Sequence, residues 1–235
     1  MKATDVSHFP NKIIDAIFKE IPLINRAIES APEERNFFLR SSKIFEVAPG
    51  DVIIKKGEFE NSIYFLLAGQ LLVYPEFEDH KKNLVNYISP GEMFGELAYI
   101  RELNRNATIV ADENSHQIIY LGTDLSDFGE IDDFSMVSIS TKISFFRAAV
   151  RINRKRLANL KIDYPENELV LKSFAHKHFT GPKNTLGELL YLRDQSKNYA
   201  SLLHKWNRSL EIDTNYHTKR GEIPIDQIKN LMNGG

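Results

Sequence analysis

Two short stretches of this chain carry the side chains best suited to ligand chemistry. They are Phe94-Gly-Glu-Leu-Ala98 and Arg105-Asn-Ala-Thr108. Glu96 offers a carboxylate that can accept a hydrogen bond from a sugar hydroxyl, and Arg105 offers a planar guanidinium suited to a phosphate. Gly95 lets the backbone approach a ligand closely, and successive N–H groups in such turns form anion-binding nests. The spacing predicts a site for a ligand that has both a ribose hydroxyl and a phosphate.

Short β segments surround these two stretches and must position them. From Ile44 to Leu121, apolar runs alternate with turns that contain Gly or Pro. The expected strands are 52–54, 63–67, 71–74, 107–111 and 117–121. Many short strands at a spacing of about ten residues predict a sandwich, barrel or jelly roll. A plain surface turn is the alternative for Gly-Glu alone, and this strand framework argues against it.

Length and composition set the broad class of the protein. The 235 residues are 42% hydrophobic, which suits one large domain or two small ones. The sequence has no run of eighteen apolar residues, so no membrane-spanning helix is expected. The first 25 residues lack the pattern of a secretory signal. The absence of cysteine excludes a disulfide framework and thiolate-held metals. We expect a cytoplasmic location.

Charge divides the chain unevenly. Residues 1–141 hold 13 Lys and Arg against 23 Asp and Glu, whereas residues 142–235 hold 17 against 9. An excess of positive charge confined to the C-terminal part suggests a polyanion partner there. A chance excess of solvated lysines is the alternative.

Helical periodicity brackets the β region. Residues 11–29 carry apolar side chains at helical spacing, with Pro22 marking a break. After residue 132 a heptad seam predicts a long helix, and its members are Ile139, Ile143, Phe146, Val150, Asn153, Leu157 and Leu160. We expect this seam to form a parallel homodimer through residues 139–160, with Asn153 fixing its register; docking on its own domain is the alternative. Charged residues on the other faces are expected to be exposed: Lys142, Arg147, Arg151, Arg154, Lys155 and Arg156.

The C-terminal segment contains a helix start and an expected turn. Thr185-Leu-Gly-Glu188 is a capping box, so a helix is expected to begin there. The polar run 193–196 predicts a break, and Ser196 could cap a second helix from Lys197 to about Leu210. Two helices joined by a short turn match helix-turn-helix geometry. Residues 219–225 read as a tight turn and a short strand. A generic helical accessory domain is the alternative.

The residues quoted above resemble a known family. Phe94–Ala98 and Arg105–Thr108 resemble the phosphate-binding cassette of cyclic-nucleotide-binding domains, and the seam with its C-terminal helices resembles catabolite-activator/FNR-type bacterial transcription regulators. The resemblance implies an α+β fold. Its expected parts are an N-terminal helical segment (1–40), a cyclic-nucleotide-binding β-roll or jelly roll (41–131), a dimerisation helix (132–162) and a winged helix-turn-helix domain (163–235).

The resemblance also implies roles for individual residues. Glu96 would bind the ribose 2′-hydroxyl and Arg105 the cyclic phosphate, with cAMP as the expected regulatory ligand. The other expected ligand contacts are Phe94, Gly95, Leu97, Ala98, Asn106, Thr108 and, for the base, Asn153. Family members usually have a small residue after the arginine, where this chain has Asn106. Its side chain could crowd the ligand or add a contact.

The same resemblance implies double-stranded DNA as a partner, with RNA polymerase as a further one. The expected DNA contacts are Lys197, Asn198, Tyr199, Ser201 and Lys205 on the recognition helix, and Lys219 and Arg220 at the wing. Leu202 stands where many family members carry an arginine, so a family operator sequence cannot be assumed. A C-terminal domain that binds protein instead of DNA is the alternative output.

No other residue pattern in the sequence predicts catalysis or metal binding. The seven histidines form no coherent ligand set, and no paired carboxylates or Ser/His/Asp arrangement stands out. We expect a regulator and not an enzyme, with no metal and no cofactor beyond its ligand. The same fold with cGMP or a cyclic dinucleotide as ligand is a further alternative.

Overall fold

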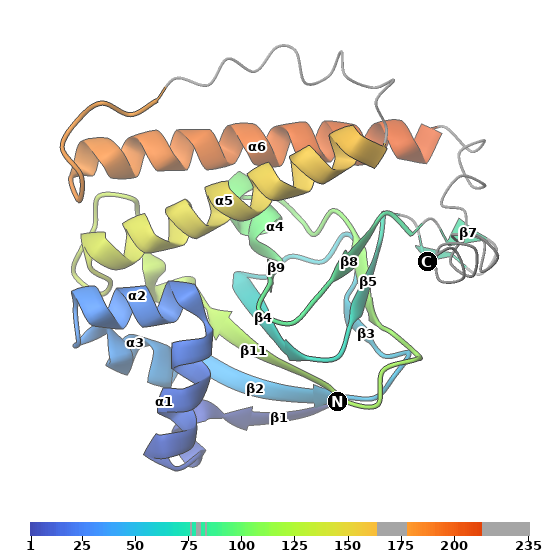
Figure 1. The fold of residues 1–235 in the computed structure, drawn as a ribbon, viewed down its shortest axis with the longest axis horizontal. Helices are drawn as coiled ribbons and strands as arrows, with labels where there is room; N and C mark the ends of the chain where they lie inside the picture. The colour runs from blue at the N-terminus through green and yellow to red at the C-terminus, as the bar shows by residue number, and fades with distance from the viewer. Residues whose placement is uncertain (76, 79–80, 83, 164–177, 213–235) are drawn as a thin grey trace, which may run out of the picture.

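The computed structural model describes residues 1–75, 77–78, 81–82, 84–163 and 178–212. Two antiparallel β-sheets form the centre of a mixed α and β fold, with three N-terminal helices at one end and two long helices across one side (Figure 1). The helical N-terminal segment and the β region that follows it agree with the expectations from sequence. The expected wing at residues 219–225 lies outside the described residues.

The five-stranded sheet has the order β1-β2-β11-β4-β9, and the four-stranded sheet has the order β3-β10-β5-β8. Their bounds are β1 Lys2–Asp5, β2 Ser42–Val47, β3 Val52–Ile54, β4 Ser62–Ala68, β5 Leu71–Tyr74, β8 Asn86–Ile88, β9 Met93–Phe94, β10 Thr108–Ala111 and β11 Ile118–Asp124. A separate pair joins β6 Phe77–Glu78 to β7 Lys81–Lys82. The five strands expected from sequence are all present. The N-terminal strand β1, which pairs with β2, was not expected.

The inner faces of the two sheets enclose one apolar cluster. Its large members include Tyr64, Phe94 and Tyr120. Tyr64 on β4 stacks against Phe94 on β9 with 5.1 Å between ring centroids, and these two residues are also register partners across the strands. This packing fixes the end of β9, and therefore the point at which the chain enters the residues after Phe94.

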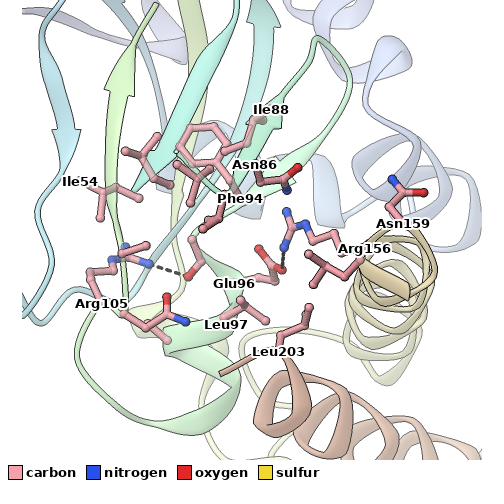
Figure 2. A pocket seen from close by; sticks show the side chains of 18 residues that line it. Ile54, Asn86, Ile88, Phe94, Glu96, Leu97, Arg105, Arg156, Asn159 and Leu203 are labelled. Carbon is pink, nitrogen blue, oxygen red and sulfur yellow. Dashed lines mark hydrogen bonds and ion pairs between the residues drawn. The ribbon is translucent and has the colours of Figure 1, made fainter. Parts of the chain in front are cut away.

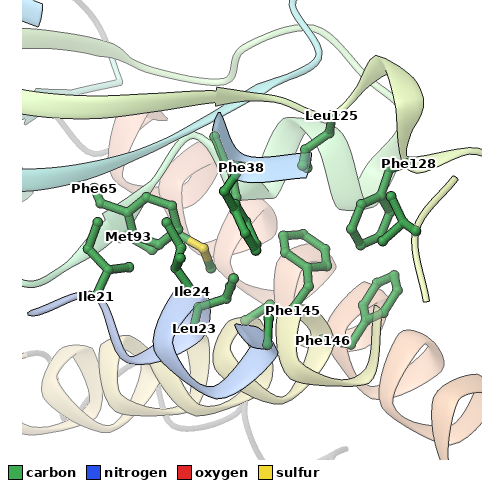
Figure 3. Close-up of a cluster of buried hydrophobic side chains, with 14 of the residues drawn as sticks. Ile21, Leu23, Ile24, Phe38, Phe65, Met93, Leu125, Phe128, Phe145 and Phe146 are labelled. Carbon is green, nitrogen blue, oxygen red and sulfur yellow. The ribbon is translucent and has the colours of Figure 1, made fainter. Parts of the chain in front are cut away.

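A larger cluster joins the helices to the outer face of the five-stranded sheet. Helices α1 (Asn11–Glu20), α2 (Pro22–Ser30) and α3 (Glu34–Ser41) bring apolar side chains against Phe65, Met93 and Leu125, and the long helix α5 (Ile139–Asp163) adds Phe145 and Phe146 (Figure 3). Pro22 begins α2, as the break at that position predicted. The N-terminal helices therefore belong to the same core as the β-sheets.

The heptad seam of α5 faces its own chain. Ile143, Phe146 and Val150 belong to the cluster that includes α2, while Leu157 and Leu160 pack against side chains of helix α6 (Leu186–Ile212). The long helices α5 and α6 lie side by side (Figure 1). In this structure of one chain the intramolecular alternative covers these residues, and the expected dimer through the seam stays a prediction.

Helix α6 runs without interruption through the expected break at 193–196. The physical reason is an apolar stripe that continues past it, because buried residues recur at steps of three and four: Leu189, Leu192, Ser196, Tyr199, Leu203 and Trp206. Ser196 is fully buried, and its hydroxyl donates to the Arg193 carbonyl within the helix. The two-helix arrangement expected for a helix-turn-helix is thus absent from residues 186–212. Thr185 caps the start of α6 as expected, since the Glu188 N–H donates to Thr185 Oγ1 at 3.3 Å, but the Glu188 carboxylate accepts from the Asn184 N–H at 2.6 Å instead of closing the box on Thr185.

Lys142 fastens the start of α5 to the loop that leaves the β-sheets. Its side chain is fully buried, in contrast to the exposed position expected from sequence. The ammonium donates to the Glu130 and Asp133 carbonyls and lies 5.3 Å from the centre of the Phe128 ring. Burial lowers the pKa of Lys142, although the neighbouring carboxylates act in the opposite direction. The backbone of this loop therefore depends on one cation.

Among the described residues, no helix is both long enough and apolar enough to cross a membrane.

We predict that Lys142→Met lowers the free energy of unfolding by about 2 kcal/mol, because two buried carbonyls lose a charged donor. Urea denaturation measures this change, with Lys19→Met on the exposed side of α1 as the control. Equal stability of the two variants would contradict the role given to Lys142.

Candidate functional site

One cavity lies between the four-stranded sheet, the stretch Phe94–Ala98 and the two long helices. It encloses about 850 Å³ of empty space, its open mouth included, which is within the size range of small-molecule sites. Its walls are largely apolar, and its polar side chains are Asn86, Glu96, Arg105, Asn106, Arg156 and Asn159. Figure 2 shows these groups converging from β8, helix α4 (Glu96–Arg101), the segment before β10, and α5.

Gly95 sets the geometry of this cavity. It begins α4 in the left-handed conformation, with φ of +81°. A Cβ atom at this position would lie 2.9 Å from Arg105 Nη1 and 3.1 Å from the Tyr64 ring. Glycine is therefore required twice, once by the backbone conformation and once by the close approach of Arg105.

Arg105 is held in place by oxygen atoms from two other segments. Nη1 donates to the Gly95 carbonyl at 2.5 Å, and Nη2 donates to the Ser62 carbonyl at 2.8 Å and to Glu60 Oε2 at 3.1 Å. The guanidinium also lies over the Tyr64 ring. Burial, followed by the hydrogen bond and charge of Glu60, raises the pKa of Tyr64, so its phenol remains protonated beside Glu60. These contacts fix the guanidinium before any ligand arrives.

Glu96 forms a buried ion pair with α5. Its side chain is 0% exposed, and Oε1 accepts from Arg156 Nη1 at 2.5 Å. Arg156, whose side chain is 18% exposed, also donates to the Met93 carbonyl at 2.7 Å and to Asn153 Oδ1 at 3.1 Å. Because an isolated buried carboxylate is strongly unfavourable, this contact ties α5 to the start of α4.

Two buried atoms at this site have no hydrogen-bond partner within the described part of the chain. They are Glu96 Oε2, an acceptor, and Arg105 Nε, a donor. Both residues line the cavity. Buried polar atoms are normally paired, so two unpaired ones on residues that line one cavity point to a ligand that supplies the missing partners. The complement is a hydroxyl donor together with an anionic acceptor.

Seven of the expected ligand contacts line this cavity: Phe94, Gly95, Glu96, Leu97, Ala98, Arg105 and Asn106. Thr108 and Asn153 do not line it, and their roles as ligand contacts stay predictions. The Thr108 hydroxyl accepts the Lys56 N–H at 3.1 Å and so ties the start of β10 to the turn after β3. Asn153 is fully buried inside α5, where it accepts from Arg156.

Helices α5 and α6 contribute lining residues that were not expected from sequence. Arg156 and Asn159 line the cavity from α5, with Arg156 pointing toward Glu96, and Leu203 of α6 approaches from below in Figure 2. The sequence did contain a sign that Arg156 faces inward. Arg156 follows the polar seam residue Asn153 by three positions and therefore lies on the same face of the helix. Its charge led to the expectation of exposure.

The residues expected to contact DNA are placed differently from a recognition helix. Tyr199 is buried against the seam of α5, and Lys197 pairs with Glu102 at 3.1 Å. Leu202 is also buried in this cluster, which explains its apolar character. Ser201 is half-buried, and Asn198 and Lys205 are exposed. Lys219 and Arg220 lie outside the described residues.

Comparison with known proteins agrees with the ligand chemistry of this cavity. Residues 44–127 match the family model described as "Cyclic nucleotide-binding domain". That segment contains both sheets except β1 and the first two residues of β2, along with α4, Glu96 and Arg105. Over these residues, which are about a third of the chain, the sequence is similar to cyclic nucleotide-binding domains.

Two curated relatives share part of this region. cGMP-dependent protein kinase 2 of Mus musculus is 33% identical over 112 residues, which cover 39% of this chain and 15% of the kinase. The cAMP-dependent protein kinase regulatory subunit of Yarrowia lipolytica is 28% identical over 120 residues, 51% of this chain and 30% of that protein. The chain thus spans less than a third of each relative.

Among solved structures, the crystal structure of Thermus thermophilus Catabolite Activator Protein is 21% identical, with 80% of this chain and 87% of that chain covered. The TM-score is 0.45, and no function is inferred from this similarity.

We predict that Gly95→Ala destabilises the protein more than Gly91→Ala does. Both glycines have nearly the same φ, +81° and +84°, but a Cβ at Gly91 meets nothing within 4 Å. The strained conformation alone costs about 1 kcal/mol, whereas the contact with Arg105 adds a further ~1–3 kcal/mol. Urea denaturation of both variants separates the two effects. Equal losses would show that Arg105 does not constrain this position.

Proposed function

We propose that this protein is a cyclic-nucleotide-responsive regulator, with cAMP as its ligand, and not an enzyme. One observation carries the proposal: Glu96 and Arg105 line the same cavity, and each keeps one buried atom without a partner among the described residues. The ribose 2′-hydroxyl would donate to Glu96 Oε2, and the cyclic phosphate would accept from Arg105 Nε. A ligand that supplies both groups satisfies both atoms at once.

The rest of the cavity suits a purine base. Apolar side chains such as Ile54, Val73 and Ile109 offer a surface for a flat ring. Asn86 on β8 and Asn159 on α5 each bring an amide that can both donate and accept a hydrogen bond. In place of Asn153, we propose these two residues as the base contacts. Because an amide can pair with adenine or guanine edges, cGMP is the second candidate ligand, and a cyclic dinucleotide is the third.

The output is proposed to be a change in the position of α6. Leu160 and Leu203 line the cavity from α5 and α6, so a bound base would press on the contact between these helices. Displacement of α6 would expose the end of the α5 seam at Leu157 and Leu160 for pairing with a second copy, and would free Lys197 and Tyr199 from their present partners. A ligand shifts such an equilibrium only through its different affinity for the two states.

We propose double-stranded DNA as the target of the released state, with RNA polymerase as a further partner. The support is the positive charge of residues 142–235, which suits a polyanion. The second candidate is a cyclic-nucleotide sensor whose C-terminal part binds a protein. The observation that favours it is the continuous helix α6, whose Tyr199 and Leu202 are buried in a hydrophobic cluster.

We predict that calorimetry of the full chain detects cAMP binding, with weaker or no binding of cGMP. Arg105→Gln should weaken cAMP binding about 10- to 100-fold, because a charged donor to the phosphate is lost. Arg105→Lys should recover part of the affinity, since it keeps the charge without the fork geometry. Arg101→Gln, on α4 but outside the cavity lining, is the matched control. Unchanged affinity in a folded Arg105→Gln variant would exclude Arg105 from the ligand site.

We predict that cAMP increases hydrogen exchange along residues 186–206 and enables binding of duplex fragments from a genomic library. DNA affinity should fall steeply as salt concentration rises, because phosphate contacts release counterions. If exchange increases but no duplex is retained at low salt, the protein-binding alternative is favoured. If exchange in α6 does not change on cAMP binding, the proposed movement is wrong.

A further inference from the structure

A second cavity lies at the other end of α4. The first cavity is lined by the N-terminal half of this helix and the second by its C-terminal half, with Ala98 shared between them. The second cavity encloses about 1010 Å³ of empty space, its opening included. Its remaining walls come from residues 59–61, the loop 128–131, α5 and α6. The cyclic-nucleotide chemistry derived above does not use it.

The acidic and basic side chains around this second cavity come from different parts of the chain. The carboxylates come from the body of the domain, namely Glu60, Glu102 and Glu130, whereas the cations Arg193 and Lys197 both come from α6. Lys197 Nζ lies 3.1 Å from Glu102 Oε1, and Arg193 is paired with Asp194 of its own helix. The domain side is therefore acidic, and the basic segment that covers it in this structure belongs to the chain itself.

Apolar side chains lie beside these carboxylates. Phe59 is 66% exposed and Leu103 is 48% exposed at the rim, and Tyr99, Phe128 and Phe146 form the inner wall. Large apolar side chains exposed around a concave site are typical of interaction surfaces. An acidic rim with an apolar interior complements a basic amphipathic segment, which is the kind of segment that α6 presents.

We propose that the second cavity is a docking site for a basic peptide segment of a partner protein. A Lys or Arg side chain of the partner pairs with Glu102 and Glu60, and a neighbouring apolar side chain packs between Phe59 and Leu103. The partner replaces Lys197 at Glu102, so docking and the present position of α6 compete for the same carboxylate.

Glu60 connects this docking site to the nucleotide cavity. It lines the second cavity with a side chain that is 48% exposed, and the same carboxylate accepts from Arg105, which lines the first. The Glu60 carboxylate and a bound phosphate would both attract the Arg105 guanidinium. A partner cation beside Glu60 neutralises part of its charge, so Arg105 interacts more strongly with the phosphate. The Gly95 and Ser62 carbonyls still hold the guanidinium. This coupling, which rests on the proposed function, makes docking and nucleotide binding favour one another.

The test uses the full chain labelled for NMR and three blocked tripeptides as probes. Lys-Phe-Lys is expected to bind and to shift the resonances of Phe59, Glu102 and Leu103, whereas Glu-Phe-Glu and Lys-Gly-Lys bind more weakly or not at all. Glu102→Gln should weaken Lys-Phe-Lys binding about two- to fivefold, and Lys197→Gln should strengthen it by a similar factor because the competing cation is gone. Phe59→Ser, an exposed change, should also weaken binding.

Equal binding of Lys-Phe-Lys and Glu-Phe-Glu, or weaker binding to the Lys197→Gln variant, would overturn the docking site.

A repeat with saturating cAMP should show Lys-Phe-Lys bound about two- to fivefold more tightly, the scale of a partly exposed charge interaction. Peptide affinity that is the same with and without bound cAMP overturns the coupling alone. Peptide binding as expected in a chain that binds no cyclic nucleotide overturns the proposed function and leaves the docking site intact.

Discussion

A carboxylate with no exposed surface requires a cation, and the arrangement of the long helices follows from how Glu96 meets that requirement. Arg156 reaches from α5 to Glu96 and also donates to the Met93 carbonyl. Helix α5 is thereby fixed against the cassette at one place, while Lys142 fixes its beginning to the loop after β11. Because a buried charge without its partner is strongly unfavourable, α5 cannot move away from the cassette unless Glu96 gains another partner. In the proposed function, a sugar hydroxyl at Oε2 would alter the same carboxylate and would therefore act on α5 directly.

Helix α6 extends this constraint to the C-terminal part of the chain. Its buried stripe packs on the seam of α5, and Leu203 reaches the nucleotide cavity while Lys197 reaches the second one. Both cavities are therefore closed by the same helix, and both adjoin the six-residue helix α4. A change in either cavity can alter the position of α6, which gives the fold a physical route from ligand to output.

Much of the cassette could be predicted from sequence because it depends on local spacing. Gly95, Glu96 and Arg105 carry their chemistry in residue type, and turns between short strands are marked by Gly and Pro. The partner that covers an apolar helix face is decided by tertiary packing, and the sequence did not distinguish between the possible partners of α5. The seam of α5 suits a second copy as well as it suits α6. The polar run 193–196 looked like a turn, yet the spacing from Leu189 to Trp206 already indicated one helix. The burial of Arg156 depended on a carboxylate sixty residues away, which no local pattern reveals.

The central claim is that Glu96 Oε2 accepts a hydrogen bond from a ribose hydroxyl. The most direct measurement compares the affinities of cAMP and 2′-deoxy-cAMP for the natural protein and for Glu96→Gln, in which an NH₂ group can replace the accepting oxygen while the amide oxygen still faces Arg156. We expect the natural protein to bind 2′-deoxy-cAMP about tenfold more weakly than cAMP, the scale of one hydrogen bond to a charged group, and the variant to lose most of this difference. Equal affinity of the natural protein for the two ligands would contradict the account.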